Sequence, residues 1–97
     1  MALDFERIRL AVPDNVITRA VDGITVVVDV DTGRSFTLDE IGSRVWTLLT
    51  TAPSAQIAYE TLLAEYAADP SAMRADVETL VEALVGNALL SVQRVQA

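Results

Sequence analysis

Two glycine-containing turns constrain the fold of this chain more than any other feature of its sequence. Asp22-Gly23 stands between residues 16–21 and the β-branched run 24–30, and an Asp-Gly pair in such a place is the strongest short-range signal for a hairpin. Asp31-Thr32-Gly33 precedes residues 34–38 and suits a three-residue loop whose glycine is left-handed. The turns therefore predict a three-stranded antiparallel meander whose third strand has a free edge.

The loop lengths also predict which residues face each other across the sheet. A two-residue loop places Ile17 opposite Val28, and a three-residue loop places Val28 opposite Phe36. Because side chains alternate between the two faces of a strand, this register collects apolar residues on one face, which we expect to pack on the core. The expected face consists of Ile17, Val21, Ile24, Val26, Val28, Val30, Phe36 and Leu38.

Residues 39–90 show the apolar spacing of three helices. Asp39, Ser54 and the pair Asp69-Pro70 stand at the expected starts, because short polar side chains cap helices and proline fits the first helical position. The predicted fold class is α+β: a three-stranded antiparallel sheet followed by a three-helix bundle, similar to a winged helix. The expected organisation is an N-terminal arm at residues 1–15, a single domain at 16–92 and a C-terminal tail at 93–97.

The composition excludes several kinds of site. The chain of 97 residues has no Cys and no His, and all 7 of its basic residues are Arg. A Cys/His zinc site, a disulfide, a Cys or Lys nucleophile and a His general base are therefore impossible. The net charge of -7 opposes nucleic-acid binding, which needs a basic face. We expect a binding module, not an enzyme, with no metal or other cofactor.

Neither a membrane segment nor a secretory signal is expected. No apolar run approaches the roughly 20 residues that a membrane helix needs. The first residues include Asp4 and Glu6 instead of the cationic segment that opens a signal peptide. The sequence therefore predicts a cytoplasmic protein without a membrane partner.

The free edge of the third strand is the feature with functional content. Residues 34–38 contain no Pro and no Lys, the residues that commonly protect sheet edges. An extended peptide can add to such an edge, with backbone hydrogen bonds for affinity and side pockets for specificity. The N-terminal arm or a second copy of the chain can cover the same edge, and the residues alone leave these alternatives open.

The order of the segments resembles the PqqD-like family. The resemblance is carried by residues 23–29, by the run Thr-Gly-Arg-Ser-Phe-Thr-Leu-Asp at 32–39 and by the Trp46 helix, and it extends over about residues 12–92. Three positions depart from the family pattern. Asp39 stands where Asn is common, Ile41 where Thr is common, and Asn87 near the usual glycine.

The resemblance implies a RiPP recognition element, a domain that binds the leader region of a ribosomally synthesised, post-translationally modified peptide precursor. The leader would add to the third strand and lie against the third helix. The implied peptide-binding residues are Arg34, Ser35, Phe36, Thr37 and Leu38 of the strand, and Met73, Arg74, Val77, Leu80, Val81 and Leu84 of the helix. Helical spacing predicts that Arg74 lies at the rim of this groove, where it would steer an acidic leader.

Among such domains, the chain looks most like the stand-alone leader-binding proteins of lasso-peptide biosynthesis. These proteins hand the precursor to a leader peptidase of the cysteine protease type or to another processing enzyme. One alternative within the family is a precursor chaperone of pyrroloquinoline quinone biosynthesis. A more distant alternative is a winged-helix DNA-binding domain, which the net charge of -7 disfavours.

Overall fold

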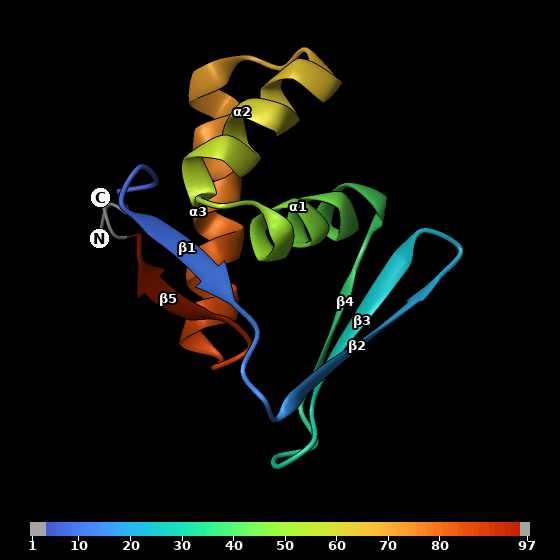
Figure 1. Ribbon diagram of the computed structural model, residues 1–97. Helices are drawn as coiled ribbons and strands as arrows, with labels where there is room; N and C mark the ends of the chain where they lie inside the picture. The colour runs from blue at the N-terminus through green and yellow to red at the C-terminus, as the bar shows by residue number, and fades with distance from the viewer. Residues whose placement is uncertain (1–3, 96–97) are drawn as a thin grey trace.

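Antiparallel strands and helices make up most of the protein in the computed structural model, which describes residues 4–95 (Figure 1). Within this range lie a three-stranded sheet of order β2-β3-β4, a two-stranded sheet β1-β5 and three helices, which confirms the predicted α+β class. The elements are β1 (Ile8–Ala11), β2 (Val16–Val21), β3 (Ile24–Asp29), β4 (Ser35–Leu38), α1 (Glu40–Thr51), α2 (Ala55–Tyr66), α3 (Pro70–Gly86) and β5 (Ser91–Arg94).

All three helices begin where the sequence predicts. In each case the residue before the helix accepts a hydrogen bond from a backbone N–H three residues on: Asp39 from Gly42 at 2.7 Å, Ser54 from Ile57 at 3.2 Å and Asp69 from Ala72 at 3.0 Å. Such bonds satisfy N–H groups that have no partner inside the helix. Within residues 4–95, no helix is both long and apolar enough to cross a membrane.

The two hairpins differ in how well their register was predicted. The β2–β3 hairpin has the expected pairing, with Ile17 opposite Val28. The β3–β4 hairpin is shifted by one residue, because its loop has four residues, so that Phe36 lies opposite Val27 and not Val28. Asp29 explains the shift: its backbone N–H donates to the carbonyl of Arg34 at 2.9 Å, and its side-chain Oδ1 accepts from the backbone N–H of Asp31 at 2.9 Å.

The sheet consequently packs on the core with a different face from the predicted one. Phe36 and Leu38 do point inward, but their partners on β3 are Val27 and Thr25, of which Val27 is fully buried. The predicted pattern failed because the covered face of β3 holds Thr25, Val27 and Asp29, of which only Val27 is apolar, so the apolar alternation along β3 pointed to the wrong face. The outer face, or the adjoining loop, instead holds Ile17, Val21, Ile24, Val26, Val28 and Val30.

The chain ends pair with each other, which the sequence did not predict. Strands β1 and β5 form an antiparallel ladder from Ile8 opposite Arg94 to Ala11 opposite Ser91, and they lie side by side in Figure 1. Phe5 and Leu10 are buried in the same hydrophobic core as the helices. The described parts of the expected arm and tail are therefore packed into the domain. Residues 1–3 of that arm and 96–97 of that tail lie outside the described range.

Candidate functional site

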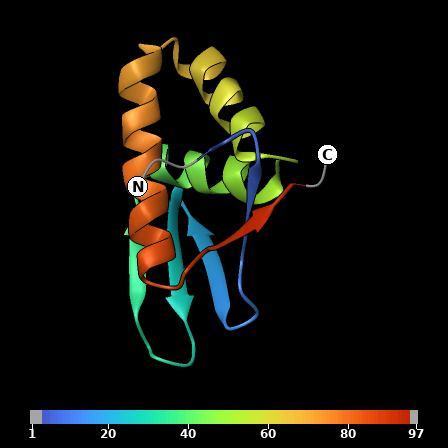
Figure 2. The same cartoon turned by 90° about the vertical axis from the view of Figure 1, so that its left-hand side faces the viewer.

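Strand β4 lies at an edge of the three-stranded sheet, on the side nearest α3 (Figure 2). Within residues 4–95 it pairs with β3 on one side and with no strand on the other. The possibility that the N-terminal arm covers this edge is wrong for the described part of the arm, because β1 pairs with β5. The backbone of β4 therefore remains open to a further strand.

The alternation of hydrogen bonds shows which β4 groups face the open edge. Asp29 donates its N–H to the carbonyl of Arg34, so these two residues form a hydrogen-bonded pair. In an antiparallel ladder such pairs alternate with non-bonded ones. The next hydrogen-bonded residue of β4 is therefore Phe36, whose backbone N–H and C=O groups face β3. The N–H and C=O groups of Ser35 and Thr37 therefore point toward the open edge.

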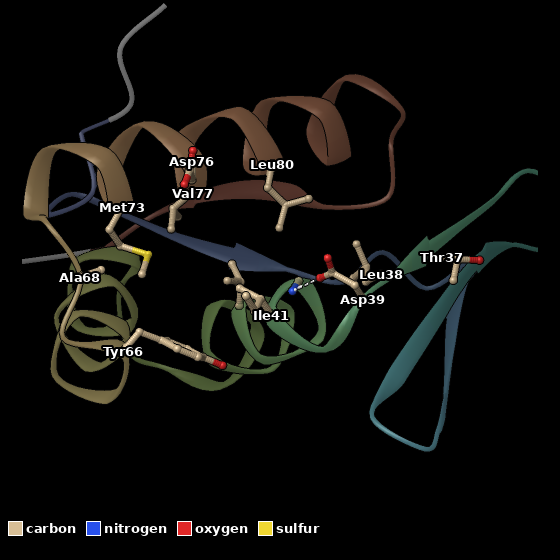
Figure 3. Close-up of a pocket in the computed structure, with 12 residues that line it drawn as sticks. Thr37, Leu38, Asp39, Ile41, Tyr66, Ala68, Met73, Asp76, Val77 and Leu80 are labelled. Atoms are coloured by element: carbon tan, nitrogen blue, oxygen red, sulfur yellow. Dashed lines mark hydrogen bonds between the residues drawn. The ribbon is translucent and has the colours of Figure 1, made fainter.

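A cavity of about 560 Å³ opens beside this edge, within the range typical of ligand pockets (Figure 3). It is bordered by the end of β4, the first half of α1, the end of α2 and the first half of α3. Its lining residues are Thr37, Leu38, Asp39, Ile41, Gly42, Val45, Tyr66, Ala68, Met73, Asp76, Val77 and Leu80.

The tight turn from β4 into α1 shapes one wall of the cavity. Ser43 is buried and donates its hydroxyl hydrogen to the carbonyl of Leu38 at 3.1 Å, which holds the start of α1 against the end of β4. A Cβ at Gly42 would lie 3.2 Å from Oδ1 of Asp39 and 3.4 Å from Cβ of Leu38. Glycine thus permits this close approach between the strand and the helix.

Helix α3 supplies the opposite wall through residues on one face. Met73, Val77 and Leu80 follow the i, i+4, i+7 spacing of a helical stripe. Val77 is 1% exposed and lies deepest, while Met73 and Leu80 are partly buried. The side chains of Val77 and Leu80 point from α3 into the space above α1 (Figure 3).

The structure brings together only some of the residues that the family resemblance implied. Val81 and Leu84 are fully buried in the core, so they support the groove from behind and do not line it. Ser35 and Phe36 belong to β4, and the exposed Arg34 precedes it. The implied residues that do line the cavity are Thr37, Leu38, Met73, Val77 and Leu80.

The predicted position of Arg74 at the rim of the groove is wrong. Its guanidinium carbon lies 3.7 Å from the centroid of the Phe5 ring and 5.6 Å from that of Tyr59. Its Nε donates to Oε1 of Glu78 at 2.7 Å, and Arg74 is not among the lining residues. The sequence could not indicate this arrangement, because Phe5 lies at the far end of the chain and carries no local signal for α3.

The cavity carries negative charge, a property that was not predicted from the sequence. Its lining includes the carboxylates of Asp39 and Asp76 and no arginine. Asp76 follows Met73 by three residues and precedes Leu80 by four, so helical spacing could have placed it near the groove. Tyr66 had no such signal, because its position depends on how α2 packs. Within residues 4–95, no group of three or more acidic side chains is placed to hold a metal ion.

Comparison with known proteins agrees with this geometry. A family model described as "Coenzyme PQQ synthesis protein D (PqqD)" matches residues 25–90, which run from β3 through α3. The chain belongs to the PqqD family. This confirms the resemblance drawn from the sequence.

A solved structure with the same fold extends the comparison beyond PqqD itself. It is described as "TbiB1 in Complex with the TbiA(beta) Leader Peptide". Its sequence is 30% identical, the TM-score is 0.75, and the match covers 84% of this chain and 94% of that one. No curated protein matches the chain.

Proposed function

We propose that this protein binds the leader region of a ribosomally synthesised, post-translationally modified peptide precursor, as a RiPP recognition element. The observation that carries the proposal is the open β4 edge directly beside an apolar cavity on α3. The similarity to TbiB1, which was solved in complex with a leader peptide, supports it. The leader adds to β4 as a fourth strand of the sheet.

In this proposal the backbone of β4 binds the peptide backbone, and the cavity binds peptide side chains. Ser35 and Thr37 offer their outward N–H and C=O groups to any extended peptide. Side chains of the added strand alternate between its two faces, so every second one points into the cavity toward Leu38, Val77 and Leu80. Backbone pairing supplies affinity that depends little on sequence, and the cavity supplies specificity.

We propose further that the precursor belongs to a lasso peptide and that the bound leader is delivered to a leader peptidase of the cysteine protease type or to another processing enzyme. The protein itself only binds, without catalysis and without a metal or other cofactor. The likeness to TbiB1 supports the leader-binding part of this assignment, and the lasso-peptide part follows from the family resemblance. The family description favours one alternative, a chaperone for the precursor of pyrroloquinoline quinone.

The test measures both affinity and the position of the bound peptide. The TbiA(beta) leader and the pyrroloquinoline quinone precursor are titrated separately into the full chain, and amide hydrogen exchange is followed by NMR. We expect the TbiA(beta) leader to bind more tightly and to slow exchange at Ser35 and Thr37, and a chelator to leave the affinity unchanged. Binding without protection of β4 would contradict strand addition, and preference for the quinone precursor would favour the alternative.

A further inference from the structure

The polar rim of the cavity is acidic, although its interior is apolar. Asp39 and Asp76 are both exposed and both line the cavity, and neither belongs to an ion pair among residues 4–95. Tyr66 lines the same cavity and is 42% exposed, so part of its ring is open to a ligand. A bound peptide therefore meets apolar surface, an aromatic ring and two carboxylates along this cavity.

Figure 3 shows how these groups are arranged along the cavity. Tyr66, Ala68 and Met73 lie toward one end. Ile41 and Leu80 lie in the middle, on opposite walls, and Asp39 lies toward the other end, where β4 enters α1. One oxygen of Asp39 accepts from the N–H of Gly42, but an ionised carboxylate offers about four acceptor positions, so capacity for a ligand remains.

We infer that the cavity selects a long basic side chain, Arg or Lys, from the bound peptide; this inference rests on the proposed leader-binding function. Such side chains lay their methylene stem along apolar surface and keep the charged head at its border. Ile41 accepts the stem, and the head reaches the carboxylate of Asp39 toward the β4 end of the cavity. Asp76, on the α3 wall, adds to the negative potential of the rim.

The spacing of an added strand allows this contact together with an apolar one. Side chains on one face of a strand recur every second residue, about 6.6–6.8 Å apart. A basic residue at the Asp39 end therefore leaves the end with Tyr66 and Met73 for a neighbouring apolar residue of the same peptide. The net charge of -7 also favours a basic peptide, because it attracts a cationic peptide from a distance. The preference is thus opposite to the acidic leader expected from the sequence.

Random peptides test the preference without the natural leader. A library of them displayed on phage is selected on the full parent chain and on the double variant Asp39→Asn/Asp76→Asn. Asparagine caps a helix as well as aspartate does, so α1 keeps its start while both charges are lost. The matched control is Asp14→Asn/Glu82→Gln, which removes the same net charge at exposed positions outside the cavity.

We expect peptides selected on the parent and on the control to share one Arg or Lys near an apolar residue, and those selected on Asp39→Asn/Asp76→Asn to keep only the apolar residue. In a selected peptide, replacing the basic residue with Met should weaken binding to the parent about tenfold, the loss expected for one charged hydrogen bond, and leave binding to the double variant unchanged. Equal basic enrichment on all three proteins, or none on the parent, overturns the inference. If selected peptides bind without slowing exchange at Ser35 and Thr37, the proposed function fails instead.

Discussion

Arg74 is held on the face of α3 that meets the N-terminal segment, where its guanidinium covers the ring of Phe5 at 3.7 Å. Arg74→Ala removes this cation–π contact and the packing of the side-chain stem, so we expect it to lower the free energy of unfolding by about 1–2 kcal/mol in urea titrations. Glu78→Gln is the matched control, because it removes only the partner of a partly exposed i, i+4 ion pair, worth about 0.3–0.5 kcal/mol. Equal effects of the two changes would contradict a role for the Phe5 contact.

Asp29 links three segments of the sheet through one carboxylate. Its Oδ1 accepts from Nδ2 of Asn15 at 3.0 Å and from the backbone N–H groups of Asp31 and Thr32 at 2.9 and 3.4 Å. The hydrogen bond from Asn15 is the main reason that the pKa of Asp29 lies below its ordinary value of 3.8; the backbone bonds add to the shift, and burial opposes it.

This lowered pKa makes part of the stability depend on pH. A carboxyl whose pKa is lower in the folded state stabilises fully above its unfolded pKa and loses that contribution as the pH falls through the folded value. We expect the stability gap between the parent and Asp29→Asn to be constant near neutral pH and to narrow below pH 3.8. Asn15→Ala removes the main donor and should weaken this dependence. Urea unfolding across the acid range measures both, and a gap that does not change with pH would refute the assignment.

Strand β4 is the element whose backbone carries the proposed function. Thr37→Pro removes an N–H that points to the open edge, while the pairing of Phe36 with β3 is untouched. We expect leader affinity to fall by about 1–3 kcal/mol, the cost of an unmet buried acceptor, with little change in the unfolding midpoint. Thr37→Val keeps the N–H and should bind like the parent in calorimetric titrations. Unchanged binding by Thr37→Pro would place the leader elsewhere.

At the scale of the elements, the helices and turns that were predicted correctly are those defined by residues close together in the sequence. Capping residues such as Ser54 and the Asp22-Gly23 turn act within a few residues of themselves, and the elements that they define were predicted correctly. The register of the β3–β4 hairpin differs by one residue from the predicted register, because the side chain of Asp29 accepts a hydrogen bond from the backbone of the loop. Rules based on loop length alone do not include this interaction. Of the residues that line the candidate site, the family resemblance indicated only those on β4 and α3. The contribution of Tyr66 depends on packing between helices and has no local signature.

At the scale of the whole molecule, the paired chain ends make the N-terminal segment part of the core. Phe5 is 1% exposed, meets the ring of Tyr59 edge-on at 6.0 Å and lies under Arg74. Neither β1 nor β5 is long enough to be stable alone, so each depends on this core for its structure.

Phe5→Ala should therefore weaken the entire fold and not merely release an arm. We expect it to lower the free energy of unfolding by about 3–5 kcal/mol, the usual cost of deleting a buried phenyl group. The loss should appear in one cooperative transition, seen equally by far-ultraviolet circular dichroism and by the fluorescence of Trp46 in α1, because both ends share one core. Val12→Ala, at an exposed position just after β1, is the control and should change stability little. A separate early transition in Phe5→Ala, with the Trp46 signal unaffected, would show instead that the arm folds independently of the rest of the domain.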